Sequence, residues 1–400
     1  MKPAVKIGSL MLAILMIFTV IASGCSVNKE FSYKTDTHEL AIGVYIYELS
    51  EAYAQAQQYA EELEGYDPSS DSWLDMEITD DDGNTAVARQ WIKDKAEQNC
   101  LEMLVLESQL QTMGATVDST LLDAYKTQAQ SYWDFGVPDA AYLQYGYGYS
   151  PMKAAMQDFG ISYESFEYAM ANYSVMKSKL FEALYLGDGP KAPSKDEVTK
   201  YFEENYVKYS YLPIELFTTT TDEEGEATTT ALSDEGVKKI TSEYEGYAKA
   251  VNAAKKDAAN KTFEDQINAY LKANDLTEKS PLVTNTAIRN KTNIGEEIDK
   301  AIAELDECKA TTVKVGKGEN AMLYYVYRYD MQSAKNDYLT KDNMDNIIYN
   351  MKDSESSDYL KSLIKELKYE KSGSVDGYDP KMFFVPREPE TTAAADTKEK

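Results

Sequence analysis

Histidine is the residue type that this sequence has least of. One histidine, His38, occurs among 400 residues, and only three cysteines accompany it. Hydrolysis by a Ser–His–Asp or Cys–His arrangement needs an imidazole beside the nucleophile, and a zinc site needs several Cys or His ligands. Asp36 and Glu39 flank His38, but a lone histidine at the start of a predicted helix is typical of a surface residue. The composition therefore disfavours histidine-dependent hydrolases and zinc centres, and it predicts no metal or cofactor.

The cysteines are too few and too widely spaced for a disulfide framework. Cys100 lies in a helical pattern, AEQNCLEMLVLESQL, and is expected to be a small buried core residue. Cys308 follows an amphipathic helical pattern and is a candidate for an exposed thiol. The spacing alone leaves open whether these two thiols are free or bridged.

Basic residues are also in short supply. The chain has 41 Lys and Arg against 68 Asp and Glu, which gives a formal net charge of −27. Phosphate binding needs a basic face, so nucleic acid is excluded as a partner. Such acidity repels anionic membranes and anionic cell walls, but an acidic composition is also what an ordinary solvated protein surface would give. With 43% hydrophobic and 12% aromatic residues, the chain can form two globular domains.

The first 24 residues have the features of a targeting segment. Lys2 and Lys6 form a basic start, and the uncharged run 7–24 would reach about 27 Å as a helix, only just a membrane span. The run ends in IASGC, which resembles a bacterial lipobox, where the signal peptide is removed and Cys25 is diacylated. That resemblance implies an extracytoplasmic protein anchored by lipid to the bacterial cell membrane. A plain signal peptide and a signal anchor are the alternatives.

The remaining sequence divides into a helical part and an α+β part. After a polar tether over 25–36, apolar residues at helical spacing predict that 37–208 are nearly all helix. Residues 209–332 then predict a strand, two helices, an extended piece, a short helix and a hairpin, which is a small α+β domain. Residues 333–370 are helical again and return to the helical domain. Residues 371–400 are expected to form an extended or disordered tail.

Several short motifs predict where elements begin and end. Ser194 followed by Glu197 predicts a capping box at the start of a helix, and Gly114 is expected to end a helix as its C-terminal cap. The DDDGN stretch around Gly83 predicts a hairpin turn. It does not fit a calcium-binding EF-hand loop, because the twelfth position would be Arg89 instead of glutamate.

One predicted strand carries a proline at its centre. This strand spans 209–217 within NYVKYSYLPIELF, and Pro213 cannot donate a hydrogen bond to a neighbouring strand. We therefore expect Pro213 at a sheet edge or at a bulge.

The order of the segments is similar to that of the PrsA- and SurA-type extracytoplasmic foldases. The resemblance rests on GISYESFEYAMANYSVMKSKLF, PSKDEVTKYFEENYVKY and IGEEIDKAIAELDECKATTVKVGKGENAMLYYVYRYD. In that family a helical chaperone domain, built from segments before and after an insert, carries a parvulin-type peptidyl-prolyl isomerase (rotamase) domain. The resemblance implies an α+β fold: a mostly helical SurA-N-like chaperone domain with an inserted parvulin-like domain. It also implies unfolded or emerging secreted polypeptides as partners.

The chain departs from this family at the residues that carry its chemistry. The parvulin motif has one histidine in the first strand and another in the last strand. Here Tyr211 stands near the first position, and Tyr324 or Tyr325 stands near the second. The family also has a Gly-rich stretch in the middle of the domain, and SPLVTNTAIRNKTN stands in its place. Tyr211 and Tyr325 are the catalytic candidates, as a cross-strand hydrogen-bonded pair that desolvates an X–Pro amide. Alternatively, they are ordinary core tyrosines.

Aromatic residues are abundant, with 32 Tyr, 11 Phe and 3 Trp beside 15 Met. The Gly-rich stretch SYWDFGVPDAAYLQYGYGYSPM could line a cleft for unfolded segments, because Tyr and Met offer adaptable apolar contacts. A loop packed over the helical core is the alternative. The client-binding candidates in this stretch are Tyr132, Trp133, Phe135, Tyr142, Tyr145, Tyr147 and Tyr149.

The sequence thus favours a lipid-anchored extracytoplasmic folding factor whose isomerase activity is weak or lost. An active peptidyl-prolyl isomerase and a non-chaperone surface-binding lipoprotein are the two alternatives.

Overall fold

The computed structural model describes residues 30–137, 151–221, 227–274, 276 and 282–386. The predicted targeting segment, including Cys25, lies outside the described residues, as do residues 387–400. Four client-binding candidates also lie outside them: Tyr142, Tyr145, Tyr147 and Tyr149.

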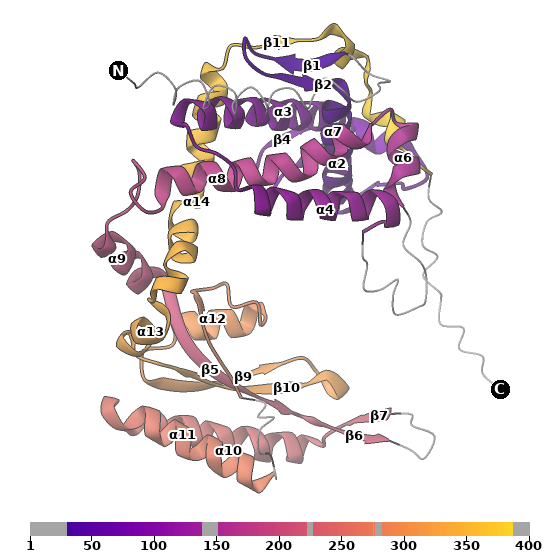
Figure 1. Ribbon diagram of the computed structural model, residues 1–400. Helices are drawn as coiled ribbons and strands as arrows, with labels where there is room; N and C mark the ends of the chain where they lie inside the picture. Colours follow the sequence, from indigo (N-terminus) through magenta and orange to yellow (C-terminus); the bar gives the residue numbers. More distant parts are fainter. Residues whose placement is uncertain (1–29, 138–150, 222–226, 275, 277–281, 387–400) are drawn as a thin grey trace, which may run out of the picture. The chain divides into compact units, whose positions relative to one another are not determined.

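The chain divides into two units. Unit 1 comprises Met1–Lys191 and Ser354–Lys400, and unit 2 is Ala192–Asp353 (Figure 1). Helices predominate, and unit 2 contains a four-stranded sheet, so the fold class is α+β and mostly helical, as the sequence predicts. Among the described residues, we find no helix whose length and apolar character would let it cross a membrane.

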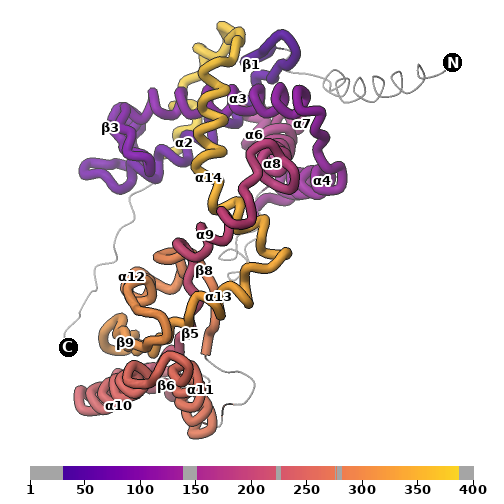
Figure 2. The backbone as a smooth tube through the Cα atoms, turned by 90° about the vertical axis from the view of Figure 1, so that its left-hand side faces the viewer, coloured from indigo at the N-terminus to yellow at the C-terminus, as the bar shows by residue number. Residues whose placement is uncertain are grey.

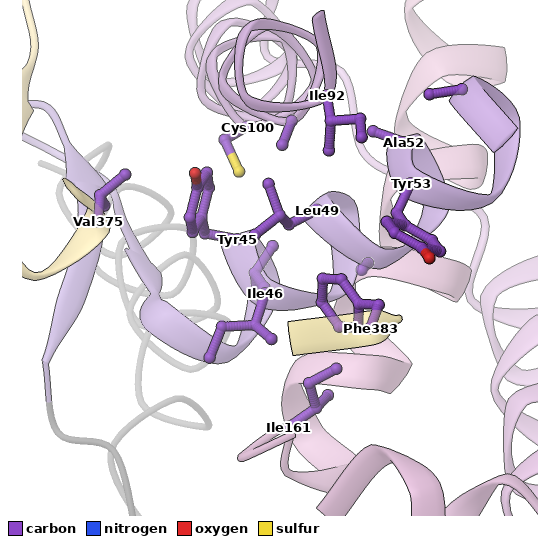
Figure 3. Close-up of a cluster of buried hydrophobic side chains, with 14 of the residues drawn as sticks. Tyr45, Ile46, Leu49, Ala52, Tyr53, Ile92, Cys100, Ile161, Val375 and Phe383 are labelled. Carbon is purple, nitrogen blue, oxygen red and sulfur yellow. The ribbon is translucent and has the colours of Figure 1, made fainter. Parts of the chain in front are cut away.

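Unit 1 is built around two long helices. Its helices are α2 (Ile42–Glu61), α3 (Ala88–Met113), α4 (Ser119–Phe135), α6 (Met152–Asp158), α7 (Tyr163–Glu167), the π-helical η3 (Tyr168–Asn172) and α8 (Tyr173–Tyr185). Tyr45, Leu49 and Tyr53 recur at helical spacing along α2 and are buried together with Ile92 and Cys100 of α3. Figure 3 shows these side chains facing one another in the core.

The helix cap at Gly114 and the turn at DDDGN that the sequence predicts are confirmed in unit 1. Gly114 ends α3 in the left-handed conformation, with φ of 62°, which a residue with a Cβ adopts at a cost. Asp118 caps α4 by accepting a backbone N–H from its first turn at 2.9 Å. The DDDGN stretch forms the turn between β3 (Glu77–Thr79) and β4 (Thr85–Val87).

The two ends of the described chain are folded where the sequence suggested a tether and a tail. Strands β1 (Phe31–Lys34), β2 (Glu39–Ala41) and β11 (Glu370–Lys371) form a sheet in the order β11-β1-β2. Beyond β11, the short helices η5 (Gly373–Gly377) and η6 (Pro380–Phe383) bury Val375 and Phe383 in the core of unit 1 (Figure 3). The expected tether over 25–36 and the expected tail from 371 were therefore wrong over the described residues. The cause is pairing between chain ends far apart in sequence, which local patterns do not reveal.

His38, expected at the surface, and Cys308, a candidate for an exposed thiol, are both buried. His38 is 8% exposed, because the chain turns there from β1 into β2, and its Nδ1 lies 2.8 Å from the Thr37 hydroxyl. Burial lowers the pKa of His38. Cys308 is 5% exposed because its N–H donates to the Arg328 carbonyl at 2.8 Å, which draws the residue into the sheet of unit 2. Cys100 is fully buried, as predicted, and both thiols are free.

Unit 2 is a twisted antiparallel sheet with helices on both faces. Its strands and helices are α9 (Lys195–Asn205), β5 (Tyr206–Glu215), β6 (Phe217–Thr221), β7 (Ala227–Ala231), α10 (Asp234–Ala253), α11 (Lys256–Ala273), β8 (Val283–Ile288), α12 (Glu296–Glu304), β9 (Lys309–Val315), β10 (Met322–Arg328) and α13 (Met331–Tyr338). The main sheet has the order β8-β5-β10-β9, and β6 and β7 form a separate two-stranded ribbon. Figures 1 and 2 show α10 and α11 on one face of this sheet and α12 on the other.

Unit 2 extends beyond the boundaries 209–332 that the sequence suggested. The predicted capping box begins α9, where Ser194 accepts the Glu197 N–H and Glu197 accepts the Ser194 N–H. After β10, α13 packs back on the sheet through the ion pair between Lys208 and Asp337. Residues before 209 and after 332 therefore belong to the same unit as the sheet. Helix α14 (Lys341–Glu366) begins in unit 2 and ends in unit 1.

A buried carboxyl lies between α2 and α3. Glu48 is 4% exposed and accepts a hydrogen bond of 2.7 Å from the Asn99 side-chain amide. Burial raises the pKa of Glu48 to about 7, and the hydrogen bond from Asn99 opposes that rise. The pKa of Glu48 is higher in the folded than in the unfolded chain. The contribution of Glu48 to stability is therefore fully present only at a pH below its unfolded pKa. That contribution is lost as the pH rises through the folded value.

We expect Glu48→Gln to stabilise unit 1 at pH 8.5 by about 3 kcal/mol, because the pKa of Glu48 rises from 4.5 to about 7 on folding and each unit of pKa difference corresponds to about 1.4 kcal/mol. At pH 4.5 the gain in stability should nearly disappear, because Glu48 is then protonated in the folded chain and is as uncharged as the glutamine that replaces it. Urea unfolding followed by tryptophan fluorescence measures this, and all three tryptophans, Trp73, Trp91 and Trp133, lie in unit 1. Glu62→Gln, at the exposed end of α2, is the matched control. An equal gain at both pH values would contradict the expectation.

Candidate functional site

The face of the unit 2 sheet under α12 is only partly covered. Val207 and Tyr209 of β5 and Val326 of β10 are buried in one cluster with Ile298 and Ile302 of α12. This cluster lies at the end of the sheet where β5 begins. Because α12 is a short helix, its two isoleucines cover that end and not the rest of the face.

Beyond α12 the same face carries apolar side chains that remain partly exposed. We call this surface the open face, and its residues are Tyr211, Pro213, Val313, Val315, Met322 and Tyr324. The register places Tyr324 directly between Pro213 of β5 and Val313 of β9. The rings of Tyr211 and Tyr324 lie 5.8 Å apart, centroid to centroid. Val283, at the neighbouring end of β8, is 40% exposed and extends the apolar surface.

The structure separates the two catalytic candidates. Because Tyr211 pairs with Val326 and Tyr325 pairs with Leu212, Tyr211 and Tyr325 point to opposite faces of the sheet. The expected hydrogen bond between Tyr211 and Tyr325 is therefore wrong. Tyr324, the other residue considered for the second position, is the one that lies beside Tyr211.

Tyr325 belongs to the core on the α10–α11 side. It is fully buried and its hydroxyl donates to Gln266 Oε1 at 2.6 Å. Burial, with the neighbouring Tyr244 and Tyr247, raises the pKa of Tyr325. A buried phenol with a satisfied hydroxyl fits a structural residue. On the other face, burial and the adjacent Tyr324 raise the pKa of Tyr211, so its phenol stays neutral at physiological pH.

Pro213 lies at a sheet edge, one of the two positions that the sequence predicted. β5 is an inner strand over its first half, but β8 ends where Val283 pairs with Tyr211. Pro213 is the next residue of β5 that turns its backbone toward that side. Its missing N–H therefore costs no hydrogen bond in the sheet.

The aromatic stretch of unit 1 contributes one exposed aromatic side chain among its described members. Trp133 is 3% exposed and packs against Tyr163 and Phe166, with ring centroids 5.5 and 5.4 Å away. Tyr132 is partly buried against the same core, whereas Phe135 is 65% exposed at the end of α4. Trp133 thus supports the alternative of packing on the core, and Phe135 remains accessible to a partner.

The open face can desolvate and contact a ligand, but it offers no strong acid or base. Its members are apolar side chains and two phenols, without a histidine or thiol, and the register places one exposed carboxylate beside them, Glu215 opposite Met322. Among the residues that the structure describes, no group of three or more His, Cys, Asp or Glu could hold a metal ion. Two hollows of about 550 and 670 Å³ exist in unit 2, at the base of the β6–β7 ribbon and beside the start of α12. Neither hollow is lined by the open face.

Sequence reasoning missed Val313, Val315 and Met322. A signal for them was present, because apolar residues alternate in TTVKV and precede the aromatic run of the last strand. What the sequence does not contain is the length of sheet that α12 leaves uncovered.

Comparisons with known proteins find limited likeness. No protein-family model matches the chain, and no curated protein matches it. Among solved structures, it is similar to the foldase protein PrsA from Streptococcus pneumoniae str. Canada MDR_19A, with 15% identity and a TM-score of 0.34, over 76% of this chain and 98% of that chain. It is also similar to PrsA from Bacillus subtilis, with 13% identity and a TM-score of 0.26, over 74% of this chain and 94% of that one.

Proposed function

We propose that this protein is a lipid-anchored extracytoplasmic folding factor that holds apolar segments of unfolded polypeptides on the open face. The observation that carries the proposal is the partly exposed surface of Tyr211, Tyr324 and their apolar neighbours in unit 2. A contiguous apolar surface on a well-packed sheet is unusual unless a partner covers it. Secreted chains that have not yet folded expose the complementary apolar segments.

The composition of the open face suits many different clients. Tyrosine gives a broad ring with a polar tip, and Met322 has a flexible side chain that fits varied shapes. Glu215, opposite Met322 at the end of this face, is the one charged side chain that the register places beside these residues. Binding of this kind depends on many weak contacts, which is typical of promiscuous recognition.

We further propose that isomerase activity is weak or lost. Prolyl isomerisation requires a pocket that desolvates the X–Pro amide and weakens its partial double bond. The open face is apolar, but it is open to solvent, and the cross-strand pair that the sequence suggested does not form. An active isomerase is the alternative, with Tyr211 and Tyr324 as the residues that would contact the amide.

Membrane attachment through Cys25 is the remaining part of the proposal. It rests on the sequence IASGC at the end of an uncharged run. A lipid on Cys25 would place both units outside the cytoplasm, where emerging secreted polypeptides are found.

The mature protein is expected to suppress the aggregation of a chemically unfolded client at stoichiometric ratios, as measured by light scattering. The double variant Tyr211→Ser, Tyr324→Ser should need about tenfold more protein for equal protection, because losing 1–2 kcal/mol of apolar contact corresponds to about that factor. Tyr270→Ser is the matched control, since Tyr270 is a partly buried tyrosine on the α10–α11 side. If Phe135→Ser alone removes protection, the client site lies on unit 1 instead. No protection by the unaltered protein would overturn the proposal.

In a prolyl-peptide isomerisation assay, the protein should leave the exchange rate of an X–Pro test peptide at its uncatalysed value, because the open face lacks an enclosed pocket. Low temperature makes the uncatalysed reaction slow enough to follow, since its activation energy is about 20 kcal/mol. The active-isomerase alternative predicts a clear acceleration that Tyr211→Phe or Tyr324→Phe reduces. Such an acceleration would refute our proposal of weak or lost activity.

Metabolic labelling with a fatty acid is expected to mark the full-length protein in a bacterial host, and Cys25→Ala should carry no label, because the acyl chain is attached to that thiol. A plain signal peptide would give a cleaved but unlabelled protein. A signal anchor would give an uncleaved and unlabelled one. Either outcome with the unaltered sequence would exclude lipid anchoring.

A further inference from the structure

β5 and β6 form one continuous strand edge. Between them, the Leu216 N–H donates to the Ala321 carbonyl at 3.0 Å, and the Leu216 carbonyl accepts from the Leu232 N–H at 3.1 Å. In an extended strand the N–H and C=O of one residue point to the same side. β10, the partner of β5, and β7, the partner of β6, therefore both pair on the same side of this continuous strand. The other side of β5 is the side on which β8 lies.

Among the described residues, no strand lies on that other side over the second half of β5. Backbone bonds fix the alternation: Asn205 accepts from Arg289 beside β8, whereas Lys208 accepts from Tyr329 beside β10. The backbone N–H and C=O groups of odd-numbered residues of β5 thus point toward β8, and those of even-numbered residues point toward β10. β8 ends opposite Tyr211, and Leu282 just before it packs into the core on the α10–α11 side. Within the residues that the structure describes, no strand pairs with this side from Pro213 to Thr221.

The same alternation continues into the ribbon. Phe217, Thr219 and Thr221 of β6 turn their backbone groups away from β7, as Glu215 does from β10. We call the free side of residues 213–221 the β5–β6 edge. No described strand pairs with the backbone donors and acceptors of this edge, and its first part, at Pro213 and Glu215, borders the open face.

The β5–β6 edge carries few of the devices that normally block strand pairing. Edge strands are commonly protected by lysines, bulges or covering segments. Here Pro213 removes one donor at the start of the edge and Glu215 is its one charged residue. The threonines of β6 are exposed, and β-branched residues favour the extended conformation that an added strand would need.

The acidity around the edge indicates what kind of segment would pair there. Glu215 is the one charged residue of the edge, and the chain as a whole carries a formal net charge of −27. In the sequence, 212–231 contain no lysine or arginine, and the four further carboxylates of this stretch, Asp222, Glu223, Glu224 and Glu226, lie outside the described residues. A basic segment would be attracted to this stretch, and an acidic one would be repelled. An added strand also alternates its side chains, so every second one would lie on the open face and should be apolar.

We propose that the β5–β6 edge binds an extended client segment as an additional strand, with apolar side chains on the open face and lysine or arginine residues between them. This inference rests on the proposed function and specifies its substrate class and its mode of binding. Backbone hydrogen bonds would supply affinity that does not depend on sequence, and the open face would select apolar side chains.

The test uses synthetic peptides whose apolar residues alternate with lysine, and binding is measured by fluorescence anisotropy with the mature protein. Methylating alternate backbone amides of the peptide, in each of the two registers, leaves the side chains unchanged but blocks strand pairing. The methylated peptide in one register should bind about tenfold more weakly, which corresponds to losing about two hydrogen bonds. The analogous peptide with glutamate in place of lysine should also bind more weakly.

A pair of proline variants tests the protein side of the contact. Thr219 and Thr229 face each other across the ribbon, and both turn their N–H groups away from the partner strand. Thr219→Pro blocks the β5–β6 edge and should weaken peptide binding about tenfold. Thr229→Pro blocks the outer edge of β7 by the same chemistry and should leave binding unchanged. Circular dichroism shows whether both variants remain folded, and the methylated peptides test the edge independently of any variant.

The outcomes separate this inference from the proposed function. If methylated peptides in both registers bind as well as the parent peptide, strand addition is refuted, whereas loss of binding in Tyr211→Ser, Tyr324→Ser would still support a client site on the open face. Equal binding of the glutamate and lysine peptides would refute the substrate class. A concentration-dependent dimer that Thr219→Pro abolishes would assign the edge to a second copy of the chain and overturn the inference. Failure to bind any peptide, together with failure to suppress aggregation, would refute both proposals.

Discussion

The antiparallel pairing of β5 with β10 is the constraint on which the candidate site depends. It joins the first strand of the unit 2 sheet to its last strand, from Tyr209 opposite Arg328 to Glu215 opposite Met322. Side chains alternate between faces along each strand, so a shift of one residue would move every tyrosine of β10 to the other face. The register is held by the burial of Leu212, Tyr325 and Tyr327 on the α10–α11 side. That burial leaves Tyr324 on the open face.

The same register explains why the sequence located the strands but not the site. In LYYVYR, large apolar residues occupy both the odd-numbered and the even-numbered positions. A period of two therefore does not reveal which tyrosine points into the core. The choice between Tyr324 and Tyr325 depends on α10 and α11, which cover one face fully, and on α12, which covers the other only in part. Local features were predicted correctly. The capping box at Ser194 and the proline at a sheet edge depend on the backbone chemistry of the residues themselves.

Long-range pairing accounts for the other differences between expectation and structure. β1 and β11 meet although they lie at opposite ends of the described chain, and neither segment has enough apolar residues to suggest a core by itself. The burial of Cys308 has a similar origin, since its N–H bonds to the last residue of β10. Such contacts are properties of the folded topology, and no window of neighbouring residues contains them.

The open face and the β5–β6 edge create a problem that the charge of the chain helps to resolve. A free strand edge beside an apolar surface is a template for pairing between copies of the same protein, and that pairing leads to aggregation. Every copy carries the same net charge of −27, so the approach of two edges is opposed by repulsion between their carboxylates. A polypeptide segment rich in lysine and arginine does not meet this barrier. The acidity that makes nucleic acid an unsuitable partner would therefore keep the edge free of other copies and accessible to basic clients.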